Sequence, residues 1–272
     1  MLDVALLQLR TPANQADALA HVAPLVDEAA NGGARLILTP EGTNLLQRDR
    51  AALLAAVRPA DQDVCVLGLR EKANQHGVWI LVGSAMLAGA GDKAVNRSLL
   101  IDPSGAIVAA YDKIHLFDVD LAGGERYRES TSFTPGEQAV TAEVDGVRLG
   151  LSVCYDLRFA ALYRALAKAG AQVLSVPAAF TRPTGEAHWR VLLRARAIET
   201  GAFVLAAAQG GSHQDGRATF GHSAVIGPWG EVLAEAEDDR PGIVRARLDL
   251  GEAAKARASI PALQHDRVFT GP

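Results

Sequence analysis

Residues 149–158 read Leu-Gly-Leu-Ser-Val-Cys-Tyr-Asp-Leu-Arg, an apolar run that leads directly into polar residues. The apolar part predicts a buried strand, and the following residues predict a turn ahead of a helix that begins near Phe159. A strand that passes through a short turn into a helix is the repeating unit of α/β folds. The stretch therefore predicts an α/β fold, and it places Cys154 at the edge of a sheet where a strand ends.

The same alternation of apolar runs and amphipathic stretches continues in both directions. Strands are expected at residues 3–9, 35–39, 78–87, 147–153, 171–176, 202–208, 223–226, 231–236 and 243–248, the last three in a meander, with a hairpin of residues 98–101 and 106–110. Helices are expected at residues 14–30, 61–75, 159–169 and 186–200. Residues 114–135 fit neither period and predict a long surface loop, which is usually functional. Because no Pro-, Gly- or Ser-rich linker divides the chain, we expect one domain over residues 1–272.

The composition excludes several classes of protein. The chain has 272 residues, 49% hydrophobic and 21% charged, with a formal net charge of −4, which excludes disordered, collagen-like and coiled-coil chains. The mild acidic balance gives no sign of nucleic-acid binding. The longest wholly apolar run, residues 202–208, is far shorter than the roughly 20 residues of a membrane helix, and we expect no signal peptide. Two cysteines exclude a disulfide framework, so a reducing, cytoplasmic location is expected.

Three side chains with catalytic chemistry stand at the ends of predicted strands. Cys154 would lie near backbone N–H groups that a helix leaves free, which can lower the pKa of a thiol and hold an oxyanion. Glu41 follows an apolar strand, and partial burial is expected to raise its pKa towards the range useful for proton transfer. Lys113 follows the second strand of the hairpin. The alternatives are a structural cysteine, a glutamate stabilised by a helix dipole and a solvated lysine.

Other candidates are weaker on residue type alone. A Cys–His hydrolase would use His115 or His222 as its base, although no spacing singles out either one. The seven histidines have no close paired spacing, so no metal site is expected. Cys65 lies in a helical pattern and is expected to pack in the core. Glu129 lies in the predicted loop, where a charged residue is usually only solvated.

Six short segments, in order along the chain, resemble motifs of the nitrilase superfamily of carbon–nitrogen hydrolases. They are residues 40–42 (Pro-Glu-Gly), 111–117 (Tyr-Asp-Lys-Ile-His-Leu-Phe), 153–159 (Val-Cys-Tyr-Asp-Leu-Arg-Phe), 185–189 (Gly-Glu-Ala-His-Trp), 194–199 (Arg-Ala-Arg-Ala-Ile-Glu) and 221–223 (Gly-His-Ser). Each match is weak alone, but the set in the right order is a strong signal. The resemblance implies a four-layer α-β-β-α sandwich of two mixed sheets flanked by helices, and a homodimer or higher homo-oligomer that pairs through helices. It implies no metal or organic cofactor.

The resemblance also implies roles for individual residues. Glu41 would be the general base, Lys113 the cation that stabilises the tetrahedral intermediate, and Cys154 the nucleophile. Glu129 matches a second glutamate that orients the lysine and the substrate in related amidases. The expected oxyanion and substrate contacts are Tyr155, through its backbone N–H, with Phe117, Arg158, Phe180 and Arg182. The alternative for Arg158 is an internal salt bridge beneath the cysteine turn, and Arg217 is a further candidate cation.

Within the superfamily the chain is similar to the branch of omega-amidase and deaminated glutathione amidase. Residues 192–200 and 206–209 favour the latter, residues 115–120 are closer to the former, and Arg182-Pro183 departs from both patterns. The expected reaction is hydrolysis of a linear amide in a small carboxylate-bearing metabolite, with deaminated glutathione giving 2-oxoglutarate and cysteinylglycine. The alternative substrates are 2-oxoglutaramate and another small amide or N-carbamoyl compound. The expected partners are the amide and water, with no nucleic acid or membrane, and a non-catalytic binding protein on the same fold is a third alternative.

Overall fold

Two six-stranded sheets pack face to face in the computed structural model, which describes residues 1–121 and 124–272. The first sheet has the order β16-β1-β2-β3-β4-β5, with β1 (Leu2–Gln8), β2 (Leu36–Leu38), β3 (Trp79–Ala88), β4 (Ala94–Ile101), β5 (Ile107–Asp112) and β16 (Gly242–Leu248). The second has the order β15-β14-β11-β10-β9-β8, with β8 (Thr141–Val144), β9 (Val147–Gly150), β10 (Val173–Ser175), β11 (Phe203–Ala206), β14 (Ala224–Ile226) and β15 (Val232–Glu235). Two short hairpins lie outside the sheets, β6 (Asp118–Asp120) with β7 (Arg126–Arg128) and β12 (Gly210–Ser212) with β13 (Ala218–Phe220).

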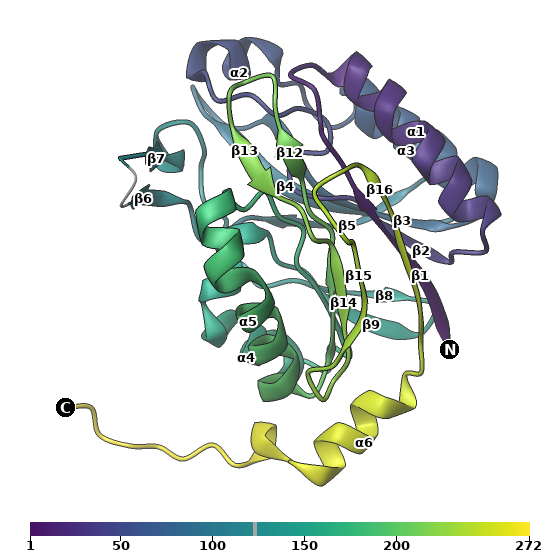
Figure 1. The fold of residues 1–272 in the computed structure, drawn as a ribbon, viewed down its shortest axis with the longest axis vertical. Helices are drawn as coiled ribbons and strands as arrows, with labels where there is room; N and C mark the ends of the chain where they lie inside the picture. The colour runs from purple at the N-terminus through teal and green to yellow at the C-terminus, as the bar shows by residue number, and fades with distance from the viewer. Residues whose placement is uncertain (122–123) are drawn as a thin grey trace.

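Helices cover the outer faces of the two sheets, α1 and α3 on one side and α4 and α5 on the other (Figure 1). The helices are α1 (Gln15–Asn31), α2 (Arg50–Ala56), α3 (Val64–His76), α4 (Ala160–Lys168), α5 (Arg182–Thr200) and α6 (Gly251–Ser259), with 3-10 turns η1 (Glu129–Thr131), η2 (Cys154–Arg158) and η3 (Ala262–Gln264). This arrangement confirms the predicted four-layer sandwich of mixed sheets flanked by helices.

Strand β1 is buried on both faces, and its residues 4–7 are all apolar for that reason. Side chains alternate across a strand, so Val4 and Leu6 join the core between the sheets, while Ala5 and Leu7 join the core beneath α1 and α3. A strand that is buried on both faces must be continuously apolar. The inner layers of the sandwich therefore follow directly from the sequence pattern.

The predicted meander at the end of the chain is wrong in its last member. β14 and β15 pair antiparallel in the second sheet, but β16 crosses to the first sheet and pairs antiparallel with β1. An alternating pattern shows that a strand is half buried, but it does not specify the neighbouring strand. The crossing ties the two sheets together, since their edge strands β15 and β16 are consecutive in the chain.

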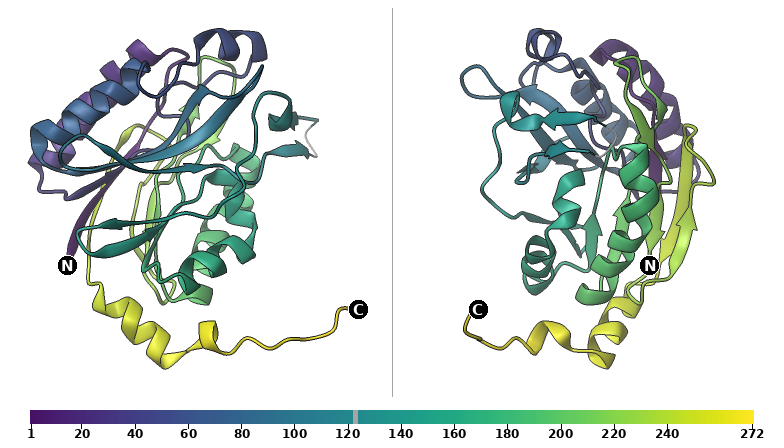
Figure 2. Two further views of the ribbon diagram at one scale, coloured as in Figure 1. Left: turned by 180° about the vertical axis from the view of Figure 1, so that it is seen from behind. Right: turned by 60° about the vertical axis from the view of Figure 1, so that its left-hand side comes forward.

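The predicted long loop contains regular structure in its described part. Residues 118–120 and 126–128 form the hairpin β6–β7, and η1 follows at once; residues 122–123 lie outside the described residues. Figure 2 shows the C-terminal stretch after α6 leading away from the sandwich. Within residues 1–121 and 124–272, none of the helices is both long and apolar enough to cross a membrane.

Gly83, in the middle of β3, allows the segments that follow β2 and β10 to approach each other closely. A Cβ atom on Gly83 would lie 1.9 Å from the backbone oxygen of Thr39 and 2.4 Å from the Cβ of Pro177. Thr39 precedes the segment that carries Glu41, and the carbonyl of Pro177 accepts a hydrogen bond of 2.8 Å from the Cys154 N–H. The missing side chain at position 83 therefore allows the Glu41 and Cys154 segments to meet.

We predict that Gly83→Ala destabilises the protein by about 3 kcal/mol, because neither a backbone oxygen nor a proline ring can move away easily. Thermal unfolding measures the effect. Gly242→Ala is the matched control, since a Cβ there meets nothing within 4 Å. Equal melting temperatures for the two variants would contradict this reading of the contact.

Candidate active site

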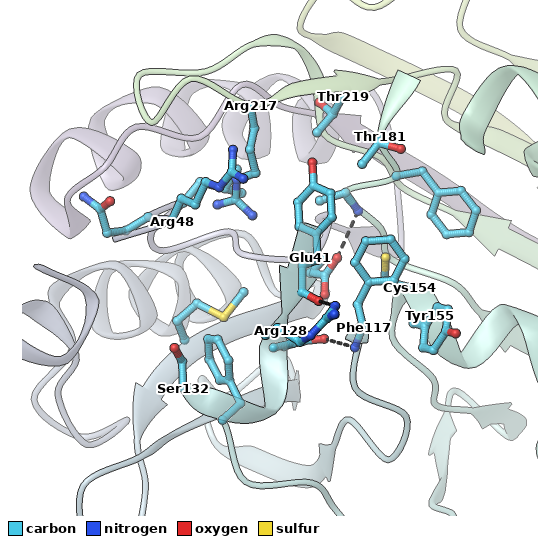
Figure 3. Close-up of a pocket in the computed structure, with 18 of the residues that line it drawn as sticks. Glu41, Arg48, Phe117, Arg128, Ser132, Cys154, Tyr155, Thr181, Arg217 and Thr219 are labelled. Atoms are coloured by element: carbon cyan, nitrogen blue, oxygen red, sulfur yellow. Dashed lines mark hydrogen bonds between the residues drawn. The ribbon is translucent and has the colours of Figure 1, made fainter. Parts of the chain in front are cut away.

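Glu41, Lys113 and Cys154 meet at one end of the sandwich because of the strand directions. β2 and β5 run the same way in the first sheet, so the residues that follow them, Glu41 and Lys113, emerge at the same edge. Cys154 follows the parallel strand β9 of the second sheet and begins η2. Figure 3 shows the side chains of Glu41 and Cys154 in one pocket.

Lys113 is the centre of a buried ion cluster. Its Nζ donates to Glu41 Oε1 at 2.9 Å and to Glu129 Oε1 and Oε2 at 3.0 and 2.8 Å. The exposed fractions of the three side chains are 2% for Lys113, 7% for Glu41 and 12% for Glu129. With so little solvent to screen the charges, one ammonium holds two carboxylates.

Two donors that were not predicted complete the cluster. Asn96, on β4, donates through Nδ2 to Glu41 Oε1 at 2.9 Å and to Glu129 Oε1 at 3.2 Å. The backbone N–H of Ala179 donates to Glu41 Oε2 at 3.0 Å. Both oxygens of the Glu41 carboxylate are therefore held in place, one from each sheet. Asn96 is followed in β4 by Arg97 and Ser98, so nothing in the sequence singled it out, and a backbone donor such as Ala179 leaves no signal in the sequence.

The turn at Cys154 is strained and anchored. Cys154 has φ of +50°, a left-handed conformation that is uncommon outside glycine. Asp156, fully buried, accepts hydrogen bonds from the Val153 N–H at 2.8 Å and the Tyr111 hydroxyl at 2.6 Å. It also accepts from the His115 N–H at 3.0 Å, with the ring Nδ1 of that residue at 2.7 Å. The anchor ties the cysteine turn to the end of β5.

The electrostatics of Glu41 differ from the expectation. Burial raises the pKa of the Glu41 carboxyl, as predicted, but the charge of Lys113 and the hydrogen bonds to the carboxylate outweigh burial and hold the pKa below its ordinary value of 4.5. Glu41 is therefore ionised at neutral pH. The expectation of a raised pKa was wrong because it considered burial without the partners.

The cysteine and the lysine both keep their protons. Burial and the neighbouring Glu41 carboxylate raise the pKa of the Cys154 thiol well above its ordinary value, although Lys113 acts in the opposite direction. Burial lowers the pKa of Lys113, but the charges of the Glu129 and Glu41 carboxylates outweigh burial and hold the pKa well above its ordinary value. The expectation that the pKa of the thiol is lowered is wrong for the site without substrate. The resting site holds a thiol, an ammonium and two carboxylates.

A cavity of about 320 Å³ opens above this cluster. Phe117, Tyr155 and Phe180, the residues expected to contact the substrate, line it, and the Phe117 and Tyr155 rings meet edge to face at 5.1 Å. No acceptor for the Tyr155 N–H is found within the described part of the chain. The Phe117 N–H donates to Glu129 Oε2 at 2.7 Å, which places Glu129 in the wall rather than in solvent.

The structure separates the two arginines that were expected to bind substrate. Arg158 lines the cavity, with its guanidinium 5.9 Å from the Tyr155 ring centre and 5.5 Å from that of Phe180. The alternative of an internal salt bridge is wrong, since Arg158 has no carboxylate partner among the described residues. Arg182 does not line the cavity and instead pairs with Asp239 at 2.6 Å. Its expected role was inferred from sequence position alone and is corrected here.

The histidines give no support to a Cys–His pair. None lines the cavity within residues 1–121 and 124–272. His115 is held by Asp156 and stacked on Phe159 with ring centres 3.5 Å apart. His222 lies beside the carbonyl of Ala236, with its Nδ1 3.2 Å from that oxygen. Both have structural partners. Cys65 is likewise buried in the core, inside α3.

Comparison with known proteins agrees with this geometry. The sequence pattern of the carbon-nitrogen hydrolase family matches residues 3–258. A deaminated glutathione amidase from Yersinia enterocolitica is 41% identical over 268 residues, covering 97% of this chain and 93% of that protein. The solved C. elegans NitFhit protein superposes with a TM-score of 0.90 at 33% identity, over 98% of this chain and 65% of that longer one.

A second solved structure shows the chemistry of a related site. It is a glutamate-to-glutamine variant of the amidase from Nesterenkonia sp. AN1, in which acrylamide has added to the active-site cysteine. Its TM-score is 0.79 at 29% identity, over 96% of this chain and 98% of that one. A reactive cysteine thus occurs in a relative with this fold.

We predict that the acid limb of the kcat/KM profile has its midpoint below pH 4.5, because Lys113 and the hydrogen bonds to the carboxylate hold the pKa of Glu41 below its ordinary value. Asn96→Leu removes a hydrogen bond that favours the carboxylate, so the pKa of Glu41 rises and the acid limb moves to higher pH. The pH profile of kcat/KM measures both, after a check that enzyme held at low pH regains activity. Asn74→Leu, at an exposed position on α3, is the control. A wild-type acid limb above pH 4.5 would contradict the cluster's electrostatics.

Proposed function

Since the chain belongs to the carbon–nitrogen hydrolase family, we propose that it hydrolyses the amide bond of deaminated glutathione, giving 2-oxoglutarate and cysteinylglycine. The observation that carries the proposal is the cluster of Glu41, Lys113 and Cys154 beneath an arginine-rich cavity. The choice of substrate is supported by the activity for which the Yersinia enterocolitica relative is named. It is also supported by charge, because this substrate carries two carboxylates.

In the first half of the reaction, Cys154 Sγ attacks the amide carbon while the Glu41 carboxylate accepts the thiol proton. The carbonyl oxygen becomes an oxyanion, which the Lys113 ammonium and the Tyr155 N–H stabilise. Protonated Glu41 then gives its proton to the amide nitrogen, the carbon–nitrogen bond breaks, and cysteinylglycine leaves. The 2-oxoglutaryl group remains on sulfur as a thioester.

In the second half, Glu41 takes a proton from a water molecule, and the resulting hydroxide attacks the thioester carbon. The second oxyanion meets the same two donors. Its collapse breaks the carbon–sulfur bond, and the departing thiolate recovers the proton held by Glu41. The net change is one amide and one water converted into one carboxylic acid and one amine, and the site returns to its resting protonation.

Two further residues have supporting roles. Glu129 keeps the Lys113 ammonium pointed at the oxyanion position through two hydrogen bonds. Arg158, over the Tyr155 ring and without a carboxylate partner in the described chain, binds the carboxylate of the 2-oxoglutaryl group. Holding that end places the reacting carbonyl near the thiol.

The competing substrate is 2-oxoglutaramate, the small amide of an omega-amidase. We predict that kcat/KM for deaminated glutathione exceeds that for 2-oxoglutaramate by at least about tenfold, because the longer substrate makes additional contacts in the cavity. Steady-state kinetics on both substrates with one enzyme preparation measures the ratio. A ratio below one would move the protein to the omega-amidase activity.

We predict that Lys113→Met lowers kcat by about 10²–10³-fold, the usual effect of losing one oxyanion donor. Methionine keeps most of the side-chain volume, so the cavity stays filled. Without the lysine, the buried Glu41 and Glu129 carboxylates lack their cation, so the variant is expected to be less stable than wild type. Kinetics are therefore measured below the melting temperature of the variant. Lys255→Met, at an exposed lysine on α6, is the matched control and should keep full activity. A kcat within threefold of wild type would remove Lys113 from the mechanism.

A further inference from the structure

The arginines of the cavity fall into two groups by their partners. Among residues 1–121 and 124–272, six arginines line it, and four of them pair with carboxylates: Arg50 with Asp92, Arg126 and Arg128 with Asp120, and Arg217 with Asp215. For Arg48 and Arg158 no salt-bridge partner exists among the described residues. Arg158 stands beside the cysteine turn, and the mechanism above uses it. Arg48 has no role in that mechanism.

Arg48 lies at the other end of the cavity from the cysteine, close to Arg217. Figure 3 shows both guanidinium groups at one end of the pocket, with Cys154 and Tyr155 at the other. The Arg48 guanidinium lies 5.4 Å from the ring centre of Tyr127. The Tyr127 hydroxyl donates to Glu125 Oε2 at 3.1 Å. Burial and the Glu125 carboxylate raise the pKa of the Tyr127 phenol, whereas the charges of Arg48 and Arg217 act to lower it, so both guanidinium groups lie near the same hydroxyl.

This end of the cavity has the chemistry of a carboxylate site. Arg217 pairs with Asp215 at 2.6 Å, and the Glu125 carboxylate accepts a hydrogen bond from the Tyr127 hydroxyl at 3.1 Å. Arg48 has no ion-pair partner among the described residues, so its guanidinium is the one available to an anion. Arginine binds carboxylates through paired N–H donors in a fixed plane. The Tyr127 ring beneath Arg48 orients that plane, which reduces the entropy lost when an anion binds.

We propose that Arg48, with Arg217 beside it, binds the glycine carboxylate at the far end of the substrate and so selects deaminated glutathione over 2-oxoglutaramate. The inference rests on the proposed function. Two amino-acid residues separate the reacting carbonyl from this carboxylate, a span of about 7 Å when extended. In 2-oxoglutaramate the chain ends at the reacting amide, so nothing reaches Arg48. The carboxylate of the 2-oxoglutaryl group is common to both substrates and is bound at the other end.

The test combines one enzyme variant with one substrate variant. The substrates are deaminated glutathione and its analogue with a terminal glycinamide, which lacks the distal charge, with 2-oxoglutaramate as the reference. For wild type, kcat/KM on the glycinamide should be about 10- to 100-fold lower than on the acid, the usual range for a charge-assisted hydrogen bond. Arg48→Ala should lose the same factor on the acid and lose nothing further on the glycinamide.

The loss should appear in KM rather than in kcat. The carboxylate is remote from the reacting carbon, so the contact is the same in the bound substrate and in the transition state. The specificity ratio of deaminated glutathione to 2-oxoglutaramate should therefore fall in Arg48→Ala. Arg240→Ala, at an exposed arginine outside the cavity, is the matched control and should keep the wild-type ratio.

The possible outcomes distinguish a failure of the role proposed for Arg48 from a failure of the proposed function. Equal use of the acid and the glycinamide by wild type, or an unchanged ratio in Arg48→Ala, would overturn the role of Arg48 and leave the proposed function standing. Failure of wild type to hydrolyse deaminated glutathione would overturn both. A fall of kcat with unchanged KM would also contradict the inference, because it would show that Arg48 acts on the reacting centre.

Discussion

One buried ammonium, that of Lys113, holds the candidate site together. Glu41 and Glu129 approach it from separate segments, and a charge with so little solvent around it is stable only with such partners. The cluster carries one excess negative charge, which favours the neutral thiol of Cys154. We infer that the thiol loses its proton only as an oxyanion forms beside Lys113, so the nucleophile is activated when a substrate carbonyl is in place.

The cluster exists only when the two sheets pack together. Glu41 and Lys113 extend from the first sheet, whereas Cys154 and the Ala179 N–H extend from the second. Gly83 permits the contact, because a side chain there would push the loops apart. Stability and catalysis therefore share one interface. This is the usual position for α/β active sites, which form where the carboxyl ends of strands meet.

The sequence predicted the positions of the candidate site residues better than their electrostatics. Cys154, Glu41 and Lys113 each follow an apolar strand, and the ends of such runs can be read from local pattern. The sign of the Glu41 pKa shift could not be read, because it depends on partners that are distant in sequence. Arg48 gave no signal, since it lies outside every motif and its significance comes from its place in the cavity. Pairing of β16 with β1 was missed for the same reason: it is a property of the tertiary fold.

Trapping the acyl-enzyme is the sharpest test of the proposed mechanism. Enzyme and deaminated glutathione are mixed, quenched in acid within one turnover, and analysed by intact mass spectrometry followed by peptide mapping. The mechanism predicts a mass increase of one 2-oxoglutaryl group, located on Cys154, while Cys65, buried in the core, stays unmodified. Product formation without any acyl group on Cys154, or an acyl group on Cys65 instead, would contradict it.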